Sequence, residues 1–107
     1  MPRFQRTIPV DDYVLDVLMM DLVGHDQQPA AFLVYLYLYR QASRCAWRDI
    51  VASLRTVAEG TGLSKSAVQI ALITLRRRQL IVTRRAHRTA TPRHKVLRHW
   101  RNGRRRP

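Results

Sequence analysis

The side chains in this sequence that could perform catalysis or hold a metal are few and poorly spaced. His87, His94 and His99, together with the single Cys45, form the one set that could bind a transition metal. The spacing of His94 and His99 matches no closed zinc pattern, and on a strand these two side chains would point to opposite faces. The chain has no paired-carboxylate arrangement, nucleophile elbow or Gly-rich phosphate loop. We therefore expect no catalytic residues, no metal, no other cofactor and no enzymatic activity.

Cationic side chains are abundant, and they are unevenly distributed. The 107 residues carry 20 Lys and Arg against seven Asp and Glu, a net charge of +13. Residues 1–52 hold five arginines against six aspartates, whereas residues 53–107 hold fifteen Lys and Arg against Glu59 alone. This asymmetry predicts a polyanionic partner, and nucleic acid is favoured. No apolar run reaches the length of a membrane span, so we expect no membrane partner and a cytoplasmic protein.

The basic half begins with a pattern typical of two helices joined by a tight turn. Ser53 is suited to cap the first helix, and the glycines of Gly60-Thr61-Gly62 permit the positive φ that ends it. Ser64 can cap the second helix. Its apolar positions recur three or four residues apart, which predicts one buried face made of Val68, Ala71, Leu72 and Leu75.

This stretch resembles the winged helix-turn-helix of bacterial transcriptional regulators, the MarR/GntR-like superfamily. The matching residues are Val57-Ala58, Thr61-Gly62-Leu63-Ser64, Val68, Leu72, Leu75 and Leu80-Ile81, and the resemblance extends from Ser53 to about Trp100. It implies a mainly α fold with a small β-hairpin wing, in which two N-terminal helices precede the winged helix-turn-helix. The implied function is a DNA-binding transcriptional regulator of the bacterial nucleoid.

The chain divides into an N-terminal arm, one domain and a tail. We place the arm at residues 1–10 and the domain at residues 11–100. Within the domain, the helix-turn-helix spans residues 53–79 and the wing residues 80–100. Residues 101–107 form a basic tail, which we expect to be disordered and to add salt-sensitive affinity for phosphate.

Two helices are predicted before the helix-turn-helix. Asp11 or Asp12 caps the first, which extends to about Val23, and Pro29 begins the second. Residues 30–39 of the second helix are apolar on every side, and such a helix must be covered all round. A homodimer through the N-terminal helices would provide that cover. The alternative is a central core helix whose three tyrosines reach the surface with their hydroxyls.

Three short strands are expected around the helix-turn-helix. Residues 47–51 can form a short strand that joins the wing as a third strand. Residues 80–83 are apolar and β-branched, which favours a strand, and residues 94–100 are expected to form the return strand. The loop between the last two strands is the wing tip.

The second helix of such a unit enters the major groove, and its outward residues are the expected base and phosphate contacts. Gln69 could bind adenine through two hydrogen bonds. Ile70 and Ile73 could pack on thymine methyl groups, or could form a protein-binding face. The predicted contacts from this helix are Ser64, Lys65, Ser66, Gln69, Ile70, Ile73, Thr74 and Arg77. The predicted wing and backbone contacts are Arg76, Arg78, Arg84, Arg85, Arg88, Arg93 and Lys95.

Three functions follow from these observations. The first is a DNA-binding transcriptional regulator, a homodimer that reads a short inverted repeat in double-stranded DNA. The second is a winged-helix module that binds RNA or a replication complex, since one fold serves many functions. The third is a protein–protein adaptor that docks through Ile70 and Ile73.

Overall fold

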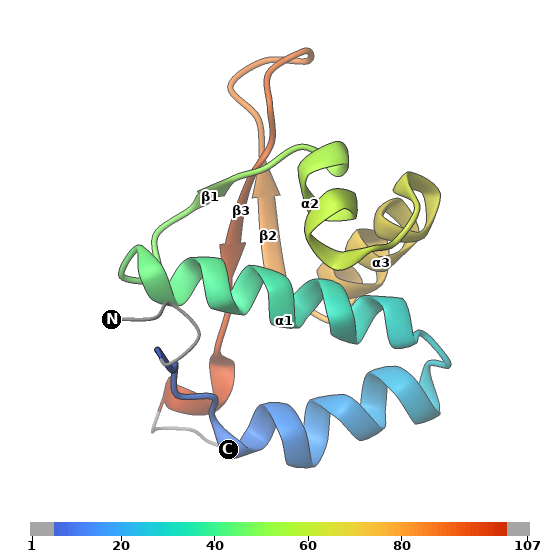
Figure 1. Ribbon diagram of the computed structural model, residues 1–107, viewed down its shortest axis with the longest axis vertical. Helices are drawn as coiled ribbons and strands as arrows, with labels where there is room; N and C mark the ends of the chain where they lie inside the picture. The colour runs from blue at the N-terminus through green and yellow to red at the C-terminus, as the bar shows by residue number, and fades with distance from the viewer. Residues whose placement is uncertain (1–5, 103–107) are drawn as a thin grey trace.

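Helix α1 (Pro29–Arg44) crosses the middle of the computed structural model, which describes residues 6–102 (Figure 1). Pro29 lies in its first turn, where the missing N–H costs no hydrogen bond. The buried side of α1 consists of Ala31, Phe32, Val34, Tyr35, Leu38, Tyr39 and Ala42. Leu33 is 45% exposed, so the rest of the described chain does not cover this apolar helix all round.

Two of the three tyrosines of α1 belong to the core. Tyr35 and Tyr39 are fully buried. The Tyr35 hydroxyl donates to the Leu97 carbonyl at 2.9 Å, and burial raises the pKa of Tyr35. The Tyr39 hydroxyl accepts from the Asp11 N–H at 3.1 Å. The alternative in which all three tyrosine hydroxyls reach the surface is therefore wrong, because two of these hydroxyls bind backbone groups inside the fold.

An N-terminal helix packs beneath α1, and it is wider than an α-helix. It comprises η2 (Val14–Leu18) and η3 (Met20–His25), in which backbone hydrogen bonds span five residues, as from the Asp26 N–H to the Asp21 carbonyl at 2.8 Å. Its buried side chains, Val14, Leu18 and Leu22, recur every four residues and face the core. The predicted helix is confirmed, but its wide backbone was not foreseen.

The basic half folds into two helices and a small sheet. Helices α2 (Leu54–Thr61) and α3 (Lys65–Arg77) lie above α1 in the view of Figure 1, on the side opposite the N-terminal helix. Strands β2 (Ile81–Arg84) and β3 (Arg93–Val96) form an antiparallel hairpin, whose loop projects beyond the other elements. Strand β1 (Ile50–Val51) pairs with β3, giving the order β1-β3-β2. The fold is thus mainly α with a small antiparallel sheet, and the predicted third strand is confirmed.

The return strand is shorter than predicted. Strand β3 ends at Val96, and a single 3-10 turn, η4 (His99–Asn102), follows it. The Trp100 ring stacks on Tyr13 with centroids 4.6 Å apart, and its Nε1–H donates to Asp11 Oδ2 at 2.7 Å. The chain therefore leaves the sheet because Trp100 docks on the start of the N-terminal helix.

Helix α1 continues beyond the apolar residues 30–39 to Arg44, and the chain then turns with positive φ at Ala46 and Trp47. Residues 1–5 of the predicted arm and residues 103–107 of the predicted tail lie outside the described residues.

Candidate nucleic-acid interface

Side-chain caps fix the turn between α2 and α3. Ser53 Oγ accepts from the Thr56 N–H at 3.1 Å at the start of α2. Helix α2 ends at Gly62, whose φ of 80° is left-handed and favours glycine. Ser64 Oγ then accepts from the Ala67 N–H at 3.1 Å and begins α3. These local signals explain why the sequence alone locates both helices.

The Thr61 side chain closes the turn from the inside. Its hydroxyl donates to the Val57 carbonyl at 2.8 Å and accepts from the Leu63 N–H at 3.3 Å. The Leu63 N–H, which lies beyond the end of α2, is thereby given an acceptor. The orientation of α3 relative to α2 is held by hydrogen bonds as well as by packing.

Helix α3 has one buried face and one exposed face. The predicted buried set, Val68, Ala71, Leu72 and Leu75, is confirmed. Ile70 is 51% and Ile73 48% exposed, and their spacing of three residues places them side by side on this face. The exposed face comprises Lys65, Ser66, Gln69, Ile70, Ile73, Arg76 and Arg77, with Ser64 exposed at the cap.

Thr74 does not belong to the exposed face, so its assignment as a DNA contact is corrected. It is only 3% exposed. Thr74 and Arg78 follow Ala71 by three and seven residues, and these positions share one side of a helix. That side faces into the fold.

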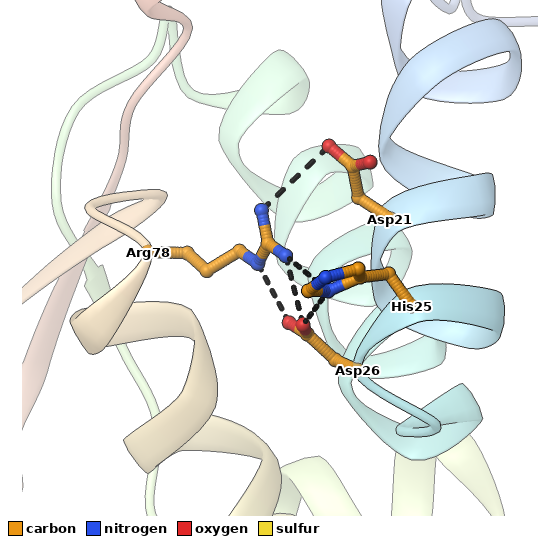
Figure 2. Close-up of polar contacts among 4 residues, drawn as sticks. All are labelled: Asp21, His25, Asp26 and Arg78. Carbon is orange, nitrogen blue, oxygen red and sulfur yellow. Dashed lines mark hydrogen bonds and ion pairs between the residues drawn. The ribbon is translucent and has the colours of Figure 1, made fainter.

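Arg78 binds acidic residues of the N-terminal helix region (Figure 2). Its Nε donates to Asp26 Oδ2 at 2.6 Å and its Nη2 to Asp26 Oδ1 at 2.8 Å. Its Nη1 lies 3.6 Å from Asp21 Oδ2, and His25 Nδ1 lies 2.9 Å from Asp26 Oδ1. Arg78 was predicted to contact DNA phosphate. The structure instead gives it an internal role, as the link between the end of α3 and the end of η3.

The protonation of this pair reflects the same contacts. The hydrogen bonds from Arg78, followed by those from His25, hold the pKa of Asp26 well below its usual range. The Asp26 carboxylate in turn raises the pKa of Arg78. Both groups are charged at neutral pH, and their two parallel hydrogen bonds form the bidentate geometry that arginine and carboxylate favour.

The β2–β3 hairpin carries like charges on its outer face. Arg84 is directly opposite Arg93, and Lys95 is opposite Val82. Arg84, Arg93 and Lys95 are exposed, whereas His94 and Val96 point inward. Like charges directly opposite each other destabilise a sheet. A polyanion bound on this face would remove that repulsion.

Arg85 and Arg88 lie in the hairpin loop, and Arg85 has a partly structural role. Arg85 Nη1 donates to the Ala90 carbonyl at 3.1 Å and to the Arg88 carbonyl at 3.4 Å. Arg85 therefore shapes the loop with one guanidinium nitrogen. The Arg88 side chain is exposed.

A groove of about 120 Å³ joins α3 to the hairpin. Gln69 and Arg76 line it from α3, and Thr83 and Arg85 line it from the hairpin. Arg76 Nη1 also lies 3.4 Å from Thr83 Oγ1. The groove brings helix and hairpin residues into one surface. Sequence reasoning missed Thr83 and the groove itself, because nothing in the sequence gives the packing of α3 against the hairpin.

His94 is a core residue, although it lies in a basic stretch of the sequence. It is 1% exposed. Its Nδ1 lies 3.0 Å from Thr83 Oγ1, and its Nε2 lies 3.2 Å from the Ala52 carbonyl. Burial lowers the pKa of His94, so the ring is neutral. The ring thereby links β2 and β3 to Ala52, the residue before the α2 N-cap.

The described residues contain no cluster of three or more His, Cys, Asp or Glu side chains that could hold a metal ion. None of the helices within residues 6–102 has the length and apolar character that a membrane crossing requires. No family model, curated protein or solved structure matches the chain. The surface formed by α3, the groove and the hairpin is therefore interpreted from its own chemistry.

Proposed function

We propose that this chain is a winged helix-turn-helix protein that binds double-stranded DNA and regulates transcription in the bacterial cytoplasm. Helix α3 would enter the major groove, and the β2–β3 hairpin would act as the wing on the backbone or in the minor groove. The observation that carries the proposal is the continuous surface on which Gln69 and Arg76 of α3 meet Arg85 of the hairpin. Arg84, Arg93 and Lys95 lie on the outer face of the same hairpin, with no carboxylate among them.

The charge distribution supports the same conclusion. From Ser53 onward the sequence contains a single acidic residue, Glu59. Glu59 accepts from Arg55 Nε at 3.1 Å on α2. Among the described residues no ion pair joins a hairpin cation to a carboxylate, which is the arrangement expected where phosphates supply the countercharge.

Salt dependence of binding tests the proposal. We expect fluorescence anisotropy with a labelled duplex to give a log–log slope corresponding to roughly four to eight neutralised phosphates. The Ile70→Glu/Ile73→Glu variant should bind more weakly than its two added charges explain. A single strand and an RNA duplex of the same length, run in parallel, test the alternative of an RNA- or replication-complex-binding module. Failure of the folded protein to bind any duplex at low salt would contradict the proposal.

We propose further that the protein is a homodimer through its N-terminal helix. The outer side of this helix exposes four large apolar side chains: Leu15 at 48%, Met19 at 40%, Met20 at 66% and Val23 at 37%. Monomeric proteins rarely expose a contiguous apolar patch of this kind, and a twofold axis would let one stripe cover its copy.

The dimer proposal is tested by the mass in solution. We expect sedimentation equilibrium to give twice the chain mass of 12.5 kDa. The Met20→Glu variant should shift the equilibrium to monomer, because two charges would face each other across the axis. Ile70→Glu, which places the same charge on α3, is the control and should remain dimeric. A wild-type monomer at high micromolar concentration would contradict the dimer.

Ile70 and Ile73 favour a second candidate function, a protein–protein adaptor. Both side chains are about half exposed on the outer face of α3. If they form a docking patch, the Ile70→Glu/Ile73→Glu variant would lose a protein partner while its DNA affinity falls no more than the added charge requires.

A further inference from the structure

A second basic site lies away from α3 and the hairpin. It is a cavity of about 380 Å³, bounded by the residues before the N-terminal helix, the end of α1 and the segment after β3. Arg6, Arg44, Arg98 and Arg101 all line it. Figure 1 places the C-terminal end of α1 and η4 on the opposite side of the molecule from α3. The cavity is therefore separate from the surface proposed to bind DNA.

Three of these four arginines have no carboxylate partner among the described residues. Asp11 is the one acidic residue that lines the cavity. Its Oδ2 lies 3.2 Å from Arg101 Nε and accepts from Trp100 Nε1 at 2.7 Å. No ion pair joins Arg6, Arg44 or Arg98 to an acidic side chain in residues 6–101. The cavity thus has three cations in excess of its one carboxylate–arginine pair.

Arg98 is held in place without an acidic partner. Its guanidinium carbon lies 3.5 Å from the centroid of the Trp47 ring, a cation–π contact. Stacking occupies the face of the guanidinium, so the N–H groups along its edge remain available to an oxyanion. Trp47 also packs edge-on against Tyr39, with centroids 4.8 Å apart. Aromatic packing thus presents one arginine in a fixed orientation.

A buried hydroxyl adds a neutral hydrogen-bond donor. Tyr39 lines the cavity although the residue is only 1% exposed. Its oxygen already accepts from the Asp11 N–H, and its own proton has no acceptor among the described residues. The cavity therefore combines an aromatic wall, a phenol donor and arginines suited to bind planar or tetrahedral oxyanions through two hydrogen bonds.

We propose that this cavity binds a small organic anion carrying more than one phosphate or carboxylate group. Its volume lies in the range of ligand sites in proteins, and its concave shape favours a small molecule over a duplex. The proposal does not depend on DNA binding, since none of its residues belongs to the α3–hairpin surface. A bound anion would join the end of α1 to the segment after β3, and would therefore stabilise the folded chain.

Two anions test the site in parallel: inorganic pyrophosphate for phosphate chemistry and citrate for carboxylate chemistry. Each is titrated into the full chain at constant ionic strength, with tryptophan fluorescence and the melting temperature as independent readouts. We expect at least one anion to give a saturable change in both. A response to pyrophosphate alone assigns a phosphorylated ligand, and a response to citrate alone assigns a polycarboxylate.

Matched variants locate the response. Arg44→Gln and Arg98→Gln should each weaken anion binding about tenfold or more, because each removes a charge-assisted hydrogen bond. Arg40→Gln removes the same charge one turn earlier on α1, outside the cavity lining, and should change the affinity less than about twofold. Arg98→Lys keeps the charge but loses the planar fork, so it should not restore full affinity.

Several results would overturn the proposal. One is the absence of a saturable response to either anion. Another is equal weakening by Arg40→Gln and Arg44→Gln, which would indicate non-specific charge attraction. A third is loss of the response in the Arg84→Gln/Arg93→Gln variant, which would place the anion on the hairpin. Competition by a DNA duplex at stoichiometric concentration would make the cavity part of a nucleic-acid surface.

Discussion

Arg78 and the hairpin arginines carry the same side chain in opposite surroundings. Arg78 binds Asp26 through two hydrogen bonds and has Asp21 nearby. Arg84 and Arg93 are directly opposite each other, and neither has an acidic partner within the described part of the chain. The first arrangement stabilises the fold, whereas the second opposes it through repulsion. An arginine that costs stability within the chain is better explained by a partner outside it.

The two regions also differ in what each connects. Arg78 joins the end of α3 to the region at the end of the N-terminal helix (Figure 2). It thereby links α3, which we propose enters the major groove, to the helix that we propose forms the dimer. Arg84 and Arg93 form no ion pair with an acidic side chain of residues 6–102. This difference separates structural cations from candidate phosphate ligands more clearly than position in the sequence does.

The largest expected effect comes from the hairpin. Arg84→Gln/Arg93→Gln should reduce duplex affinity about tenfold to a hundredfold and lower the log–log salt slope by about 2, because two phosphate contacts are lost. The melting temperature should not fall, since a repulsive pair is removed. Anisotropy across a salt series measures the first effect and calorimetry the second. A fall in stability with unchanged affinity would reverse the assigned role of this pair.

A smaller effect, on stability and not on duplex affinity, is expected at the Arg78–Asp26 pair. Asp26→Asn should reduce the free energy of unfolding by about 1–2 kcal/mol, because it leaves a half-buried Arg78 without its carboxylate. Urea denaturation measures the loss. The control is Arg55→Gln, which breaks the exposed Arg55–Glu59 pair and should cost less than about 0.5 kcal/mol. Equal losses in the two variants would show that burial does not strengthen the Asp26 pair.

The smallest effect is a dependence of stability on pH. His94 is buried with a lowered pKa, so below about pH 6.5 the unfolded state takes up a proton that the native ring resists, and stability falls. The pKa of Asp26 is also lowered, so its contribution is complete above about pH 4 and is lost as the pH falls further. Urea denaturation at a series of pH values measures both.

Two variants separate the contributions of His94 and Asp26 to this pH dependence. His94→Gln should remove the fall just below pH 6.5, because its amide does not titrate. Asp26→Asn should remove only the part below about pH 4. If the fall below pH 6.5 persists in His94→Gln, another group accounts for it.

Local signals explain what the sequence could predict. Ser53, Gly62 and Ser64 act on backbone groups within four residues of themselves, so α2, its turn and α3 were placed correctly. The short strand before Ser53 was also predicted, and it pairs with β3. The roles of Thr74 and Arg78 were readable in principle, because both share the helical side that contains Ala71.

Contacts between distant segments explain the rest. The return strand ends early because Trp100 binds Asp11, 89 residues away in sequence. His94 lies in a basic stretch but is buried against Ala52. The anion cavity combines side chains from the beginning, middle and end of the chain. No periodicity in the sequence encodes these pairings.

The most direct test of the central proposal is to map the duplex onto the protein by NMR. Amide and side-chain signals of the full chain would be recorded with and without a duplex at moderate salt. We predict that the changes gather at Lys65, Gln69, Arg84 and Arg93, with none at Arg44 or Arg98. Changes confined to the N-terminal helix or to the anion cavity would contradict the proposal that α3 and the hairpin bind DNA.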